Sequence, residues 1–217
     1  MASRRKFRPR TRSSGSRGLS RLIIIATEGT HTEKKYFEDM ATQYYHNPRV
    51  HVQVLERLTS ASSPEHILKV LNSFEKEYLL GKDDELWMVI DLDRWHNREL
   101  GSIAAQCKQK GYRLAVSNPC FELWLLLHIK SLDDYTDVEL QELVENKRVS
   151  EKRTRLEREL LDKLGSYNKS NPDTSKFLPF VDIAIERARA LDPHPEHRWP
   201  NSLGTRVYLL AETIIAQ

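Results

Sequence analysis

Leu22-Ile23-Ile24-Ile25-Ala26-Thr27 runs directly into Glu28-Gly29, and Leu86-Trp87-Met88-Val89-Ile90 runs directly into Asp91-Leu92-Asp93. Each apolar run is short and continuous, which is typical of a parallel strand covered by helices on both faces. Ligand chemistry in open α/β sheets gathers outside the carboxyl ends of the strands, so the acids that follow the two runs are expected to face one cleft. Three carboxylates in one cleft indicate a site for a hard divalent cation.

Strand and helix patterns alternate around these two runs. Further strands are predicted at residues 50–55 and 112–116, and helices at about 63–81 and 97–110. Another helix is predicted after the first strand, where Thr30 or Thr32 is a candidate cap and Thr30-His31-Thr32-Glu33 resembles a capping box. This order predicts an α/β fold, with a mostly parallel four-stranded sheet flanked by helices.

From Cys120 onward the pattern is helical. Helices are predicted at residues 121–129, 138–163 with a break at Asn146-Lys147, 177–191 and 205–216. We therefore divide the chain into an α/β core at residues 19–130 and a helical C-terminal extension at 131–217, packed on that core.

The first 18 residues form a separate, basic segment. They hold seven arginines and lysines and no acid, which leaves 27 basic residues against 31 acidic ones in the remainder of the chain. We predict a disordered basic tail at residues 1–18. Such a tail fits a nucleic-acid-binding arm, and it equally fits a solvated leader.

The acids after the strands suit magnesium chemistry. Mg²⁺ or Mn²⁺ is commonly held by one or two carboxylates together with substrate phosphate oxygens. Asp91 and Asp93, two residues apart in an extended segment, point to the same side and can approach one ion. Glu28 can complete the metal site or move a proton. The structural alternative makes Glu28 a turn acid and the aspartates helix caps.

Glu122 interrupts the apolar run Phe121-Glu122-Leu123-Trp124-Leu125-Leu126-Leu127. An unpaired charge there would be costly, so Glu122 requires a partner. That partner is a metal or basic site residue if Glu122 is functional. A structural ion pair, or a position in the first turn of a helix, explains Glu122 as well.

Four blocks of the chain carry a family resemblance. They are residues 23–37 (IIIATEGTHTEKKYF), 91–95 (DLDRW), 117–124 (SNPCFELW) and 200–207 (PNSLGTRV). On these blocks the chain resembles the RloB family, whose core resembles the Toprim fold of topoisomerases, primases and overcoming-lysogenization-type nucleases. Toprim domains place a glutamate after the first strand and a D-x-D after a later one, which matches Glu28, Asp91 and Asp93.

The resemblance implies a function. It implies a Mg²⁺- or Mn²⁺-dependent Toprim-type endonuclease that cleaves DNA or RNA, with tRNA among the substrates considered, and that serves as the effector of a phage-defence or abortive-infection system. Its partner would be an ABC-type or overcoming-lysogenization-like ATPase. A Y-x-K segment of the family corresponds to Tyr167-Asn168-Lys169, so Lys169 joins Glu28, Asp91, Asp93 and Glu122 as a candidate catalytic residue, although a lysine in a polar loop is usually only solvated.

Other classes of protein are disfavoured or kept as alternatives. The chain has no P-loop and no G-x-G-x-x-G motif, so ATP hydrolysis would have to come from a partner. No apolar run reaches the roughly 18 to 20 residues of a membrane span, and we expect a soluble, cytoplasmic protein. Alternatives are a non-catalytic Toprim-like module that binds nucleic acid or an ATPase, and a small-molecule phosphohydrolase. Homo-oligomerisation stays open.

Overall fold

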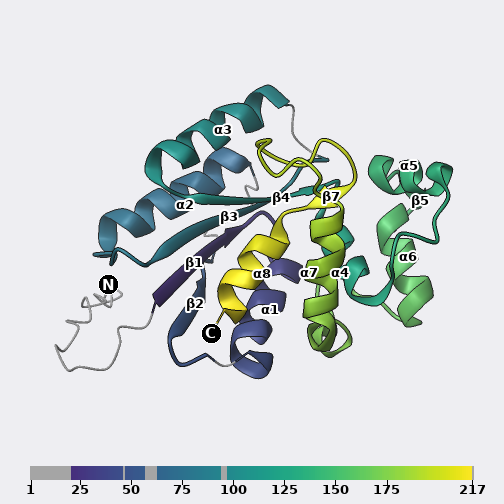
Figure 1. Ribbon diagram of the computed structural model, residues 1–217, viewed down its shortest axis with the longest axis horizontal. Helices are drawn as coiled ribbons and strands as arrows, with labels where there is room; N and C mark the ends of the chain where they lie inside the picture. Colours follow the sequence, from purple (N-terminus) through teal and green to yellow (C-terminus); the bar gives the residue numbers. More distant parts are fainter. Residues whose placement is uncertain (1–20, 46, 57–62, 94–96, 217) are drawn as a thin grey trace, which may run out of the picture.

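The computed structural model describes residues 21–45, 47–56, 63–93 and 97–216, and the predicted basic tail lies outside them (Figure 1). Within the described residues, five strands form one sheet in the order β2-β1-β3-β4-β7. The strands are β1 (Arg21–Thr27), β2 (Val50–Val54), β3 (Glu85–Asp91), β4 (Arg113–Asn118) and β7 (Gly204–Thr205). The first four pair in parallel, which confirms the predicted mostly parallel α/β sheet.

The fifth strand, β7, was not predicted. It pairs antiparallel with the end of β4, with Ser117 opposite Thr205 and Asn118 opposite Gly204. A strand of two residues is too short to show the alternation on which strand prediction depends. The helix expected from residue 205 accordingly begins two residues later, as α8 (Val207–Ile215).

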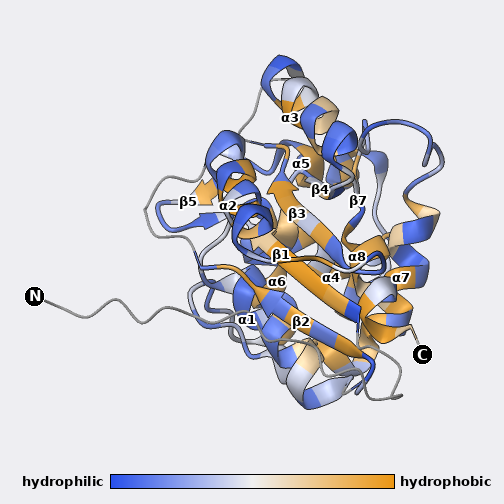
Figure 2. Cartoon of the chain, turned by 90° about the vertical axis from the view of Figure 1, so that its left-hand side faces the viewer, coloured by the Kyte–Doolittle hydropathy of each residue, from blue (hydrophilic) through white to orange (hydrophobic). Residues whose placement is uncertain are grey.

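Helices cover both faces of the sheet (Figure 1). On one face lie α2 (Pro64–Glu77) and α3 (Asn97–Lys110); on the other lie α1 (Thr32–Asp39), α4 (Phe121–Ile129), α7 (Val181–Ala190) and α8. Successive residues of β1 enter two different cores, because Ile23 and Ile25 pack on the α4 side and Ile24 and Ala26 pack on the α2 side. The apolar sheet between two helical layers is visible in Figure 2, and it explains why the strands read as continuous apolar runs.

Helix α4 is buried on all sides, as its apolar sequence indicates, and packs against both α7 and α6 (Arg155–Leu164). The predicted break at Asn146-Lys147 is confirmed: α5 (Asp137–Glu145) ends at Asn146, which has the left-handed conformation with φ 42°. A hairpin that was not predicted follows, formed by β5 (Arg148–Ser150) and β6 (Arg153–Thr154). Its strands are short and polar, so no apolar pattern marks them.

The proposed capping box at Thr30–Glu33 was wrong. His31 occupies the N-cap of α1 and makes no side-chain capping bond. Genuine capping boxes occur at Thr136–Glu139 and Thr154–Glu157, where they begin α5 and α6. Glu33 points inward instead of back along its own helix, and this difference changes the candidate site described below.

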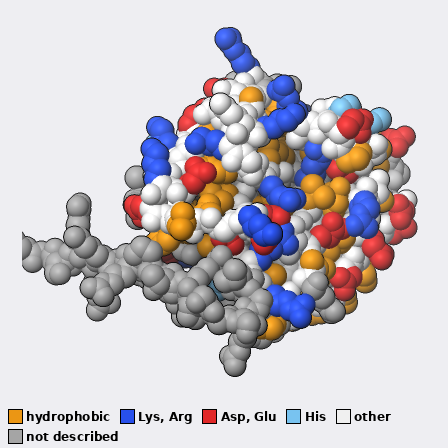
Figure 3. Space-filling view, turned by 60° about the vertical axis from the view of Figure 1, so that its left-hand side comes forward, with side chains coloured by type: hydrophobic (Ala, Val, Ile, Leu, Met, Phe, Trp, Pro, Cys, Tyr) orange, Lys and Arg blue, Asp and Glu red, His pale blue; other side chains and the backbone are white. Residues whose placement is uncertain are grey.

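The described surface carries mixed charge. On the face drawn in Figure 3, basic side chains lie across the surface with acidic and apolar side chains between them. Among the described helices, none has both the length and the apolar character needed to cross a membrane.

Candidate functional site

The sheet brings Glu28 and Asp91 together at the ends of neighbouring strands. The Glu28 backbone amide donates to the Val89 carbonyl oxygen at 3.0 Å, continuing the pairing of β1 with β3. The Glu28 carboxylate in turn accepts a hydrogen bond from the Asp91 backbone amide, with Oε2 at 3.2 Å from the nitrogen. Glu28 is 3% and Asp91 8% exposed. The two acids predicted to share a cleft therefore share one edge of the sheet.

Asp91 also caps a helix. Its Oδ1 accepts a hydrogen bond of 2.9 Å from the backbone amide of Phe121, the first residue of α4. A carboxylate at a helix N-terminus is stabilised by the helix dipole and by the otherwise unpaired amides. The amides of Leu92 and Asp93 donate to the Pro119 carbonyl oxygen at 3.0 and 3.1 Å, so the D-x-D segment is held against the start of α4. Asp93 itself is exposed.

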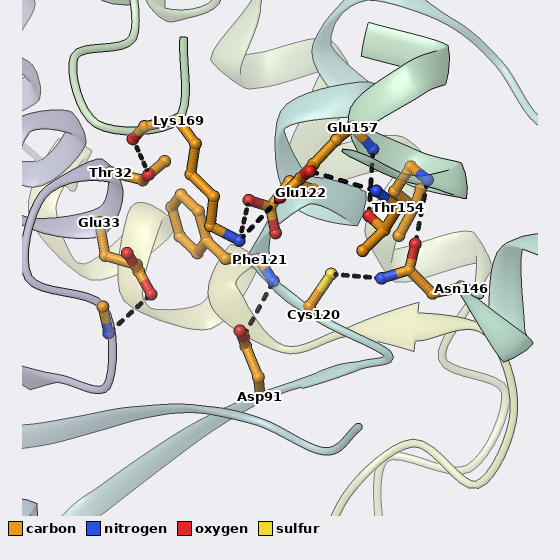
Figure 4. Close-up of polar contacts among 12 residues, drawn as sticks. Thr32, Glu33, Asp91, Cys120, Phe121, Glu122, Asn146, Thr154, Glu157 and Lys169 are labelled. Atoms are coloured by element: carbon orange, nitrogen blue, oxygen red, sulfur yellow. Dashed lines mark hydrogen bonds and ion pairs between the residues drawn. The ribbon is translucent and has the colours of Figure 1, made fainter. Parts of the chain in front are cut away.

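Glu122 and Lys169, which are 47 residues apart in the sequence, form an ion pair in this site. The Lys169 ammonium lies 2.7 Å from Glu122 Oε1 and 3.3 Å from Glu157 Oε1. The Glu122 side chain is 2% exposed, whereas that of Lys169 is 47% exposed. Figure 4 shows Lys169 reaching down from its loop between Glu33 and Glu122. Thr32 fixes that loop, because its hydroxyl donates to the Lys169 carbonyl oxygen.

Glu33 is a site residue that sequence reasoning missed. Its Oε1 accepts a hydrogen bond of 2.9 Å from the Gly29 amide. A Cβ at position 29 would lie 1.7 Å from Glu33 Oε2, so the glycine makes room for this carboxylate. One signal was available: Glu33 shares a helix face with Tyr36 and Phe37, both fully buried, which places its own side chain inside.

The carboxylates raise one another's pKa. Burial, followed by the charges of Glu33, Glu122, Glu28 and Asp93, raises the pKa of Asp91 well above its usual range. Burial and then the charge of Glu122 raise the pKa of Glu33 to about 7. Burial is the largest single influence on Glu122 and disfavours its ionised form, but the Lys169 charge and the hydrogen bonds to the carboxylate together outweigh burial and hold the pKa of Glu122 below its ordinary value. The cluster thus has one ionised acid paired with lysine and two acids that a further positive charge would help to ionise.

This arrangement fits a divalent metal by its donor chemistry. Every acid in the cluster offers carboxylate oxygens, which are the ligands that Mg²⁺ and Mn²⁺ prefer. The carboxylates around Asp91 repel one another, and a bound cation would offset this repulsion. Asp91 and Asp93 are the candidate ligands, because both line a pocket, and the buried Glu28 carboxylate lies next to Asp91.

A pocket of ≈ 120 Å³ opens in front of the two aspartates. Asp91 and Asp93 contribute acidic groups to its lining, and the hairpin and the Lys169 loop contribute basic ones: Arg148, Lys152, Arg153 and Lys169. Asn146 anchors the hairpin segment, since its amide donates to Cys120 Sγ at 3.3 Å while its Oδ1 accepts from the Leu156 amide at 3.0 Å. Carboxylates and cations therefore line the same small pocket, although the hairpin cations were not among the predicted site residues.

Two other buried polar residues lie outside this cluster. Arg206 forms a two-point ion pair with Asp192 at 2.8 and 3.0 Å. His128 is buried between the Tyr36 hydroxyl and the Trp124 carbonyl oxygen, and burial lowers its pKa to about 3. His128 is thus a neutral core histidine.

The fold and this cluster define an α/β protein with acids gathered at the carboxyl edge of a mostly parallel sheet. The chain belongs to the RloB-like protein family, whose model matches residues 23–214. That match includes the sheet, the acidic cluster, the hairpin and the Lys169 loop. No curated protein and no solved structure matches the chain.

Proposed function

We propose that this chain is a divalent-metal-dependent endonuclease that cleaves phosphodiester bonds in DNA or RNA, with tRNA among the candidate substrates. The observation that carries the proposal is the pocket in which Asp91 and Asp93 face the cations of the β5–β6 hairpin and Lys169. A nucleic-acid strand needs both groups: carboxylates that hold a metal against an oxygen of the reacting phosphate, and cations that neutralise that phosphate and the neighbouring ones.

Asp91 and Asp93 would hold the Mg²⁺ or Mn²⁺ ion, with Glu28 as a further ligand or a proton acceptor. When bound, such an ion polarises a phosphoryl oxygen and lowers the pKa of a coordinated water. The fold holds the carboxylates of Asp91 and Glu28 in place. Asp91 is oriented by the Phe121 amide and Glu28 by the Asp91 amide, so both carboxylates are positioned before any ligand arrives.

Lys169 is suited to stabilise the charge that develops on the phosphate. Glu122 and Glu157 hold its ammonium at 2.7 and 3.3 Å, and an ammonium has three donors. The half-exposed side chain also lines the pocket. A fixed cation needs little reorganisation as the transition state forms, which is the basis of electrostatic catalysis.

Glu33 is suited to move a proton. In the hydrolysis, a water oxygen forms a bond to phosphorus and loses a proton, while the bond from phosphorus to the leaving sugar oxygen breaks and that oxygen gains one. A carboxyl group with a pKa of about 7 exchanges protons readily at neutral pH. Glu28 is the alternative proton carrier in the same cluster.

The proposal extends to a biological role through the family resemblance. We propose a cytoplasmic effector of phage defence, controlled by an ABC-type or overcoming-lysogenization-like ATPase. The chain has no P-loop of its own, so any ATP hydrolysis in such a system would come from that partner.

A second candidate function is a non-catalytic module that binds nucleic acid or an ATPase. It is favoured by the contacts that the acids already make: Asp91 caps α4, Glu33 binds the Gly29 amide and Glu122 pairs with Lys169. In addition, no three acids of this cluster, as far as the chain is described, bring ligand oxygens within 4.8 Å of one another.

One experiment separates the two functions. The purified chain, with and without Mg²⁺ or Mn²⁺, is incubated with single- and double-stranded DNA and with RNA, and its metal binding is measured by calorimetry. Asp91→Asn with Asp93→Asn removes the site. Asp83→Asn is the matched control, because Asp83 is an exposed acid before the opposite end of β3. Cleavage that needs metal and is abolished in the double variant supports the nuclease; nucleic-acid binding without metal binding supports the module.

A further inference from the structure

A second group of metal-ligand side chains lies in the loop between α7 and β7, seen at the top of Figure 1. His194, Glu196 and His197 are exposed there, and one ligand atom from each lies within 4.8 Å of the others. Two imidazoles and a carboxylate differ chemically from the acidic cluster, since they combine nitrogen and oxygen donors. The spacing H-x-E-H matches no standard motif, so this grouping emerges from the loop conformation.

The distances suit a small tetrahedral ion. Glu196 Oε1 lies 3.2 Å from His194 Nδ1 and 3.7 Å from His197 Nε2. Zinc binds nitrogen and oxygen at about 2.0–2.1 Å, so neighbouring ligand atoms around a tetrahedral zinc stand roughly 3.3 Å apart. Both carboxylate–imidazole distances are thus within a few tenths of an ångström of that value, and the two imidazole nitrogens lie within 4.8 Å of each other.

The loop backbone is held in this conformation from below. Arg206, whose guanidinium is paired with Asp192, donates hydrogen bonds to the His194 and His197 carbonyl oxygens. The His197 amide donates to the His194 carbonyl oxygen at 3.0 Å, closing a turn between the two histidines. A buried ion pair thus fixes the backbone that presents the three side chains, which lowers the ordering cost of binding a ligand.

We propose that His194, Glu196 and His197 form a binding site for a borderline transition-metal ion, with Zn²⁺ as the best fit, separate from the acidic cluster. Imidazole ligands favour Zn²⁺, Cu²⁺ or Ni²⁺ over Mg²⁺. Three protein ligands leave a fourth position for water or for a donor from another molecule. The site would be accessible, because all three side chains are exposed.

Asn201 supplies a test of the geometry. Its side-chain nitrogen Nδ2 lies 3.0 Å from His197 Nδ1, the ring nitrogen that faces away from Glu196. A metal at Nε2 requires a proton on Nδ1, so on metal binding the Asn201 amide must turn over and accept the Nδ1–H hydrogen bond through its oxygen. A carboxylate in the same place would accept it more strongly and raise the basicity of the ligand, as carboxylates behind metal-bound histidines do.

The test is a titration of the full chain with Zn²⁺ in excess Mg²⁺, which keeps Zn²⁺ from the acidic cluster. We expect one equivalent of Zn²⁺ in the wild type and in His51→Ala, an exposed histidine on β2, and its loss in His194→Ala and His197→Ala. Unchanged melting temperatures without metal would show that the variants fold. Equal Zn²⁺ stoichiometry and affinity in wild type and His197→Ala would overturn the proposal.

A second measurement concerns the coordination itself. Co²⁺ in place of Zn²⁺ should give the intense visible absorption of a four-coordinate site, and His197→Ala should abolish it. Asn201→Asp should tighten Zn²⁺ binding by about 10-fold, and Asn201→Ala should not tighten it. An Asn201→Asp chain that binds Zn²⁺ no better than Asn201→Ala would contradict the assigned geometry.

Discussion

The Lys169 ammonium stands 2.7 Å from the Glu122 carboxylate, although the two residues come from a surface loop and from the first turn of the fully buried helix α4. The pair joins the Lys169 loop to the start of α4, next to the carboxyl edge of the sheet. A buried carboxylate without its cation is costly, so Glu122 depends on Lys169 for its charge. Lys169 is half exposed, so it pairs with Glu122 and also lines the pocket.

Removing the Lys169 cation should lower both stability and activity, and neutralising Glu122 as well should restore only the stability. Lys169→Met should lower the free energy of unfolding by about 1–3 kcal/mol, because Glu122 loses its partner, and should reduce cleavage by roughly 10²-fold or more. Adding Glu122→Gln should restore part of the stability and none of the activity. Urea unfolding and cleavage rates measure both; restored activity in the double variant would rule out a catalytic role for Lys169.

Asp91→Asn should stabilise the metal-free protein while removing activity. The folded-state pKa of Asp91 is raised, so its ionisation opposes folding at neutral pH, and a neutral amide removes this cost. Asn keeps an oxygen to accept the bond from the Phe121 amide. We expect a melting temperature higher by at least about 2–4 °C, which corresponds to about 1 kcal/mol in a chain of this size.

Added Mg²⁺ or Mn²⁺ should then reverse the order of stability. An ion that binds the native state stabilises it by about 2.7 kcal/mol at a hundred times its dissociation constant. Wild type should gain melting temperature with metal, whereas Asp91→Asn should not, and Asp83→Asn should behave as wild type. The same metal-induced shift in the wild type and in both variants would place the ion away from Asp91.

Glu33 should make stability depend on pH. Its pKa rises from 4.5 to about 7 on folding, so the unfolded chain releases the proton first. This group stabilises the fold below about pH 4.5, and its contribution is lost as the pH rises toward 7, by on the order of 3 kcal/mol. Glu33→Gln should remove that dependence from the metal-free protein. Unfolding free energies measured from pH 4.5 to 8 in wild type and variant test it; parallel curves would contradict it.

Gly29→Ala tests the place of Glu33 without removing its carboxylate. The new methyl group would overlap Glu33 Oε2, which is the end of a flexible side chain and can move. We expect a large loss of activity with little loss of stability. Gly101→Ala in α3, where the added atom meets its nearest neighbour at 3.4 Å, is the control and should keep full activity. Normal cleavage by Gly29→Ala would show that activity does not depend on the position of the Glu33 carboxylate.

The sequence predicted the parts of the site that follow long apolar strands and missed those that depend on tertiary contacts. Glu28, Asp91 and Asp93 were found because buried strands are continuous and apolar. Glu33 was considered only as part of a capping box at Thr30-His31-Thr32-Glu33, a local pattern that its burial overrides. The hairpin cations were missed because β5 and β6 have three and two residues. The Glu122–Lys169 pair joins residues too distant in sequence for any local pattern to connect them.

Charge removal in the β5–β6 hairpin should weaken binding of a polymer without altering the chemistry. Arg148 and Lys152 are exposed and line the pocket with Asp91. For each phosphate that the variant no longer neutralises, the slope of log affinity against log salt should fall by about 0.7–0.9. Arg148→Ala and Lys152→Ala should therefore raise KM for DNA or RNA several-fold, leave kcat within about twofold, and flatten the salt dependence.

The control for the hairpin variants is Lys108→Ala, an exposed lysine near the end of α3 that leads to the opposite edge of the sheet. Hydrolysis of a small phosphodiester should be unchanged in all three variants, because such a substrate does not extend beyond the metal and Lys169. An equal loss on the small substrate and on the polymer would instead place Arg148 or Lys152 at the reacting phosphate. If Lys108→Ala weakened polymer binding as much as Arg148→Ala or Lys152→Ala, the hairpin would not be a specific binding site, and the effect would come from the overall surface charge.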